Sequence, residues 1–154
     1  MDLETFKANI PELVDEAIEA GKKISEGKTV LTVSLDSIKD MDPIVDYVHH
    51  LWEKKLIDDH IAWNVSYIFG TLLGEIIIKE QGFHWEIFDN LPVVGKNEKN
   101  WVSPISKIYK IITDTDDGEG TPSNFYDSFK VMLQYESMSD EEKEKLTIYV
   151  DKKD

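Results

Sequence analysis

Apolar residues recur every three or four positions over the first 24 residues. This spacing predicts an amphipathic helix with one buried stripe. Pro11 predicts either the true first turn of this helix or a kink near residue 10. Gly27 follows the last turn, where a left-handed cap is expected. The stripe consists of Leu3, Phe6, Ile10, Leu13, Val14, Ala17, Ile18 and Ile24.

Residues 29–35 alternate between apolar and polar side chains, which is typical of a half-buried strand. A second helix is expected over residues 43–55, because Asp42 can accept hydrogen bonds from free backbone amides and Pro43 suits a first helical turn. Residues 37–41 are then expected to form a short preceding turn of helix.

Residues 61–78 form the most apolar stretch of the chain, interrupted by Glu75. We expect Asp58 or Asp59 to cap the helix that carries this stretch and Gly82 to end it. A membrane-spanning helix needs about 20 apolar residues, and an ionised Glu in its inner half costs on the order of 2 kcal/mol or more. The pattern therefore favours a buried central helix over a membrane span.

The second half of the chain predicts a hairpin. Apolar and polar residues alternate over 83–87, a turn is expected at Asp89 and Asn90, and two valines follow at 93–94. A further short extended piece is expected at residues 101–102.

Three helices and a strand are expected after the hairpin. Ser103 and Thr121 each precede a proline, as helix-capping residues often do. Ser139 and Glu142 have the spacing of a capping box, and residues 147–150 predict a final strand.

The order of these elements predicts an α+β fold. No internal repeat or long linker divides the chain. We therefore expect a single α+β domain over residues 1–154, with about five to six helices packed around a small, mostly antiparallel sheet.

Charge narrows the function classes. The 17 basic residues are all Lys, and 31 acidic residues give a formal net charge of −14. Nucleic acid and anionic membranes are repelled by this charge, and the side chain best suited to bidentate phosphate binding is missing. The chain has no Cys and begins with acidic residues where an export signal would be basic. We expect a cytoplasmic protein.

The four histidines do not predict a metal site. His49 and Glu53 stand one helical turn apart, but no HExxH motif or third ligand accompanies them. We expect neither a metal nor another cofactor.

Residues 114–120 are rich in acids and have a superficial likeness to a calcium loop. The glycine comes one place too early, and Phe125 stands where the closing Glu would be. A solvated turn is the plain interpretation, and the functional one is a site that presents negative charge to a basic protein partner. The partner-binding residues would be Asp114, Asp116, Asp117 and Glu119.

Glu75 follows Gly70 and Gly74, which would let another backbone approach closely. An acid in this apolar helix predicts a carboxylate that accepts from a backbone amide, a tryptophan or a lysine. The alternative is a buried functional site formed with His84 and Trp85. The sequence offers no nucleophile, base or phosphate loop to complete a catalytic set.

Several short motifs resemble a family of small uncharacterised bacterial cytosolic proteins, in which a GxxLGE helix precedes a GxxW strand. The matching segments are residues 69–75, 82–85, 103–110 and 125–126, together with Pro92. The resemblance covers about residues 30–130 and implies a compact domain that in part of the family accompanies secreted toxins as an immunity protein. The chain departs from the family at residues 111–114, where the family continues into an Arg and an Asn-Gly turn.

These observations favour a non-enzymatic protein-binding function. The leading hypothesis is an immunity protein that neutralises a bacterial toxin domain through an acidic surface. The alternative is a small-ligand binder or enzyme with a site near Glu75 and His84.

Overall fold

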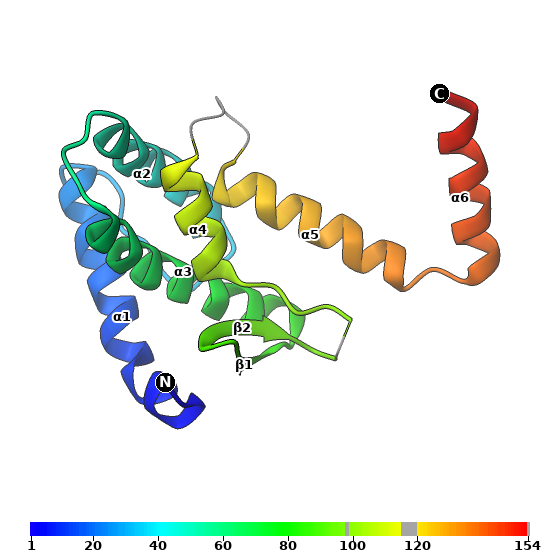
Figure 1. Ribbon diagram of the computed structural model, residues 1–154, viewed down its shortest axis with the longest axis horizontal. Coiled ribbons are helices and arrows are strands. Elements are labelled where there is room, and N and C mark those ends of the chain that lie inside the picture. The colour runs from blue at the N-terminus through cyan, green and yellow to red at the C-terminus, as the bar shows by residue number, and fades with distance from the viewer. Residues whose placement is uncertain (98, 115–119, 154) are drawn as a thin grey trace.

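The computed structural model describes residues 1–97, 99–114 and 120–153, with the side chains of this set up to residue 146. Over this part the chain forms six helices and one two-stranded antiparallel sheet (Figure 1), which confirms the α+β single-domain fold class. The elements are α1 (Leu3–Ile24), α2 (Asp36–Glu53), α3 (Asp59–Gln81), β1 (His84–Phe88), β2 (Leu91–Gly95), α4 (Pro104–Thr113), α5 (Pro122–Glu136) and α6 (Asp140–Lys153).

Helix α1 begins well before Pro11. The Asp2 carboxylate caps it by accepting from the Thr5 amide at 2.7 Å. Pro11 lies inside the helix, so the prediction that it marks the first turn is wrong. Tertiary burial on both sides of Pro11, at Phe6 and Val14, stabilises the continuous helix.

Residues 29–35 do not form the predicted strand. They form an extended and bent connection to α2. The Thr32 amide donates to the Ser37 hydroxyl at 2.8 Å, and no neighbouring strand of the described chain pairs with this segment. Leu31 is fully buried beside Gly21, so its apolar character reflects packing of a loop against α1.

Helix α2 is one continuous helix, where the sequence predicted a short turn and a separate helix beginning at Pro43. Pro43 lies inside it. The predicted cap, Asp42, instead accepts from the Ser123 amide at 3.0 Å and from the Ser123 hydroxyl. Ser123 is in the first turn of α5, so Asp42 helps to cap a helix that lies 81 residues further along the chain.

Helix α3 is the central helix, as predicted. Asp58 caps it by accepting from the Ile61 amide at 2.9 Å, and Gly82 ends it with a φ of 69°. Within the described residues, α3 is long and apolar enough to cross a membrane, but 56% of its most apolar window is buried inside the molecule. That burial agrees with a core helix.

The small residues of α3 allow close packing, as the sequence predicted. A Cβ placed on Gly70 would lie 2.5 Å from Ile105 Cα of α4. A Cβ placed on Gly74 would lie 2.2 Å from Trp85 Cη2 of β1. Helix α3 therefore contacts α4 on one side and the hairpin on another.

The predicted hairpin is confirmed. Strands β1 and β2 pair antiparallel with Trp85 opposite Val94. Asp89 and Asn90 form the turn with φ values of 50° and 64°, as a two-residue hairpin loop with right-handed twist requires. The predicted extended piece at residues 101–102 contributes one bridge, between Val94 and Val102.

The predicted caps of the later helices are also confirmed. Ser103 accepts from the Ser106 amide at 3.1 Å, and Thr121 accepts from the Asn124 amide at 3.1 Å. At Ser139, the hydroxyl accepts from the Glu142 amide at 3.2 Å, and the Glu142 carboxylate accepts from the Ser139 amide and hydroxyl.

The predicted final strand at residues 147–150 is wrong, because α6 continues through it. A strand needs a partner edge, and α6 lies apart from the hairpin and from the body of the molecule (Figure 1). The capping box at Ser139 starts a helix that nothing interrupts before Lys153.

Candidate functional site

The predicted acidic contact residues are only partly described. Asp116, Asp117 and Glu119 lie outside the described residues. Asp114 is exposed at the C-terminal end of α4, where its amide donates to the Lys110 carbonyl at 2.8 Å. The role predicted for this loop stays a prediction.

Glu75 has the structural partner that the sequence predicted. Its Oε2 accepts from the Trp85 indole N–H at 3.1 Å. Trp85 is only 3% exposed, and its ring meets the edge of Phe6 at a centroid distance of 4.9 Å. The carboxylate therefore satisfies an indole donor that would otherwise be buried without a partner.

Glu75, His84 and Trp85 also line one cavity of about 380 Å³, together with Lys7 of α1. His84 is exposed, and its ring stands edge-on to Trp101 at 5.1 Å. No hydrogen bond or ion pair joins Glu75 to His84, both of which the structure describes. The cavity contains no paired acid and base.

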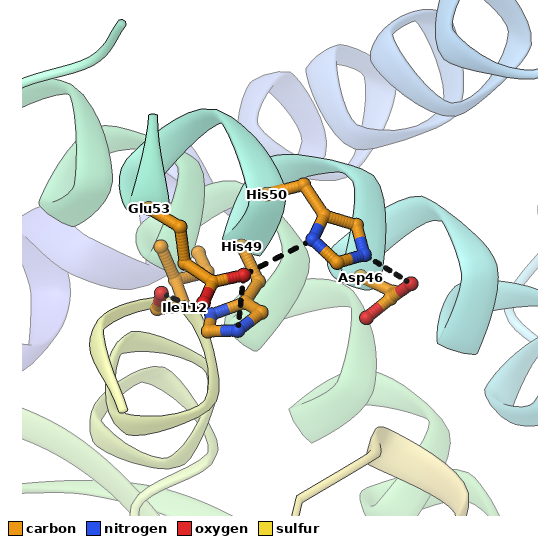
Figure 2. Close-up of polar contacts among 5 residues, drawn as sticks. All are labelled: Asp46, His49, His50, Glu53 and Ile112. Carbon is orange, nitrogen blue, oxygen red and sulfur yellow. Dashed lines mark hydrogen bonds and ion pairs between the residues drawn. The ribbon is translucent and has the colours of Figure 1, made fainter. Parts of the chain in front are cut away.

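Two histidines near the end of α2 form a polar cluster with two carboxylates (Figure 2). Glu53 Oε1 lies 3.2 Å from His49 Nε2 and 3.1 Å from His50 Nδ1. Asp46 Oδ2 lies 3.3 Å from His50 Nε2. The spacing of His49 and Glu53 was visible in the sequence, but its link to α4 was not.

That link is a contact between His49 Nδ1 and the Ile112 carbonyl oxygen, at 2.8 Å across 63 residues of sequence (Figure 2). A carbonyl oxygen only accepts, so His49 donates from Nδ1. Its Nε2 faces the Glu53 carboxylate, and both contacts are hydrogen bonds only when the ring is doubly protonated. Through the hydrogen bond between His49 and the Ile112 carbonyl, the cluster connects α2 to α4.

Within residues 1–97, 99–114 and 120–153, no group of three or more His, Asp or Glu side chains is arranged to hold a metal ion.

A site that sequence reasoning missed lies between α1 and α3. A groove of about 560 Å³ runs along these helices, with an apolar floor and a polar rim. One feature of the sequence could have indicated this groove: Glu12 and Glu16 stand one helical turn apart at the edge of the buried stripe of α1. The lining residues are Met1, Thr5, Phe6, Asn9, Glu12, Leu13, Glu16, Asn64, Val65, Tyr67 and Ile68.

The rim of this groove is negatively charged. Glu12 and Glu16 are exposed, and neither forms an ion pair with any residue that the structure describes. Among the residues that the structure describes, no Lys or His lines the groove. The amino terminus of Met1 is a cationic group at its edge and donates to Asn90 Oδ1 at 2.7 Å.

Tyr67 gives the α3 wall both apolar and polar character. Its ring is half-buried, and burial raises the pKa of its phenol above the usual value. Its hydroxyl has no hydrogen-bond partner among the described residues. A neutral hydroxyl is therefore available to a bound molecule at neutral pH.

Tyr109 marks a second contact between α3 and α4. Its ring stacks on Trp63 at 3.8 Å, and its hydroxyl donates to Asp59 Oδ1. That hydrogen bond, with partial burial and the negative charge of Asp59, raises the pKa of Tyr109. The arrangement locks the start of α3 to α4.

Comparison with protein-family models, with curated proteins and with solved structures found no match for this chain.

Proposed function

We propose that this chain is a non-enzymatic, cytoplasmic binding protein that neutralises a bacterial toxin domain by covering a basic surface of that domain with its own carboxylates. The net charge of −14 supports this role, because complementary potentials speed association and select partners. Residues 69–75 and 82–85 resemble a family that includes immunity proteins, and this resemblance is the reason for proposing a toxin as the partner.

The observation that carries the proposal is the lack of intramolecular partners for the carboxylates of α1. Five of its acids are exposed, and none forms an ion pair with a described residue. The two pairs between Lys and a carboxylate that the described part contains are Asp127–Lys130 and Glu141–Lys145, in α5 and α6. The five acids are Glu4, Glu12, Asp15, Glu16 and Glu19.

A direct test is to produce the chain together with the product of the adjacent reading frame in a host that this product harms. We expect growth to be restored. We also expect the association rate of the purified pair to fall at least tenfold between about 0.02 M and about 0.3 M NaCl, because salt screens charge attraction. Neutralisation without any salt dependence would contradict an electrostatic mechanism.

The predicted contacts of the 114–120 loop are tested in the same system. Replacing Asp114, Asp116 and Asp117 by Asn and Glu119 by Gln should slow association, because it removes four negative charges from residues 114–119. Unchanged neutralisation and unchanged salt dependence would show that the loop is not part of the interface. The acidic contact surface would then be α1.

A second candidate function rests on the cavity beside Glu75. Its lining combines a carboxylate, Lys7, His84 and an indole around about 380 Å³, a volume that accepts a small polar ligand. Screening polar metabolites by thermal shift tests it. A ligand that stabilises the native chain but not the Lys7→Met and His84→Phe variants would support this function.

A further inference from the structure

The α1/α3 groove has the dimensions of a helix-binding site. Its volume of about 560 Å³ exceeds that of the cavity beside Glu75. Along α1 its lining runs from Thr5 to Glu16. At about 1.5 Å per residue this is about 16 Å, or three turns of helix.

The floor of the groove is firm and apolar. Phe6 is 2% exposed and is held by its edge-on contact with Trp85. Leu13, Val65 and Ile68 are half-buried and present the rest of the apolar surface. An amphipathic helix laid into such a groove buries apolar side chains spaced three, four and seven residues apart.

The charge of the rim selects the partner. Glu12 and Glu16 are exposed at the groove, and neither forms an ion pair with a described residue. A helix with Lys or Arg flanking its apolar face would bring cations to these carboxylates, and its apolar residues would displace water from the half-buried Leu13, Val65 and Ile68.

We propose that the α1/α3 groove is the docking site for a basic amphipathic helix of the protein partner, whose apolar face enters the groove and whose cationic side chains meet Glu12 and Glu16. The proposal rests on the function proposed above and names the surface and the partner chemistry that this function uses.

Charge argues against two other occupants. A second copy of the chain would bring another −14 to an acidic rim. The chain's own α6 begins with Asp140, Glu141 and Glu142, which would face the same repulsion.

The test uses a synthetic 18-residue helical peptide with Leu along one face and Lys on the other. Its controls are a scrambled peptide of the same composition and a peptide with Glu in place of Lys. We expect calorimetry to detect binding of the first peptide only, and amide NMR shifts to concentrate in α1 and α3.

Matched charge variants locate the contact. The double variant Glu12→Gln/Glu16→Gln should bind the Lys peptide about tenfold more weakly at low ionic strength, since each lost ion pair at a partly exposed rim contributes a few-fold in affinity. Asp36→Asn/Asp40→Asn changes the net charge equally at two exposed residues of α2, outside the groove lining. This control should stay within about twofold of the native chain.

Two tryptophan substitutions test whether the peptide binds inside the groove. Asn9 is exposed and lines the groove, whereas Ala8 is exposed and does not. Asn9→Trp should abolish binding, and Ala8→Trp should not. Equal binding of the scrambled peptide, or equal effects of the two charge pairs, would overturn the proposal, because either result shows attraction to acidic surface in general.

The same variants separate this proposal from the proposed function. If the native chain and the Asn9→Trp and Glu12→Gln/Glu16→Gln variants all neutralise the partner toxin equally, the groove assignment is wrong and the neutralising function stands. If no toxin is neutralised while the Lys peptide binds the groove, the groove assignment stands and the proposed function is wrong.

Discussion

At the scale of single residues, Gly74 matters because it has no side chain and so lets Trp85 pack directly against α3. Trp85 occupies the space that a Cβ at position 74 would need. The Trp85 ring cannot shift without a loss of stability, because it is buried, donates a hydrogen bond to Glu75 and contacts Phe6.

We expect Gly74→Ala to lower the free energy of unfolding by about 1–2 kcal/mol, because overpacking outweighs the gain of about 1 kcal/mol in helix propensity. Urea unfolding measures the change. In a Trp85→Phe background the smaller ring should remove most of the cost, and an unchanged cost there would show that its origin is elsewhere.

Tyr109 gives a prediction for pH dependence. Its hydrogen bond to Asp59 favours the neutral phenol and raises the folded-state pKa above the ordinary 10.0. The stabilisation is therefore fully present below pH 10 and is lost as the pH rises through the folded-state pKa. Absorbance titration near 295 nm should show two tyrosines ionising late, Tyr67 and Tyr109, and Asp59→Asn should move the Tyr109 transition to lower pH.

Tyr109→Phe serves as the control and should remove one of the two late transitions. The late transition that persists in this variant should belong to Tyr67, because burial raises its pKa as well. If Asp59→Asn leaves both late transitions unchanged, the hydrogen bond to Asp59 is not what raises the pKa of Tyr109.

At the scale of elements, helix ends are held both locally and across the fold. Asp58, Ser103 and Thr121 cap the helices that they precede. Asp42 is different, since it sits within α2 and accepts from the first turn of α5. It therefore couples two helices that are distant in sequence.

We expect Asp42→Ala to lower the free energy of unfolding by about 1–2 kcal/mol, because the Ser123 amide loses its acceptor. Asp40→Ala is the matched control, since Asp40 is exposed on the same helix. Equal losses for the two variants, measured by denaturant unfolding, would mean that general charge effects in α2 explain the result.

The wrong strand predictions also belong to this scale. Residues 29–35 and 147–150 both have strand-like composition, yet neither meets an exposed sheet edge in the described structure. The hairpin at residues 84–95 was predicted correctly because its two strands and its turn are adjacent in sequence.

At the scale of the whole molecule, the main feature is the large excess of negative charge. With 31 acids against 17 Lys, the folded chain concentrates like charge that the unfolded chain spreads out. The Debye length falls from about 30 Å at 0.01 M salt to about 8 Å at 0.15 M, so added salt relieves this repulsion.

We therefore expect the melting temperature to rise by several degrees between about 0.01 M and about 0.3 M NaCl, as measured by calorimetry. The Asp15→Asn/Glu19→Gln variant should be less sensitive to salt. A melting temperature that falls with salt would show that attractive ion pairs outweigh the repulsion.

The α+β class, the central helix, the hairpin and most helix caps followed from the sequence alone. Each depends on residues within a few positions of one another, as at Ser139 and Glu142, so local spacing is enough to specify it. The sequence also predicted that Glu75 accepts a hydrogen bond from a residue type such as tryptophan, because a carboxylate in an apolar helix needs a donor and Trp85 stands ten residues away.

Only the tertiary structure decided which distant surfaces meet. The role of Asp42, the contact of His49 with Ile112 and the α1/α3 groove all join residues more than 50 positions apart. Periodicity assigns a residue to a face of its own helix, but the neighbour of that face depends on how the helices pack around Gly70 and Gly74. The groove lies between α1 and α3, and its lining includes the buried Phe6 of α1 and the half-buried Tyr67 of α3.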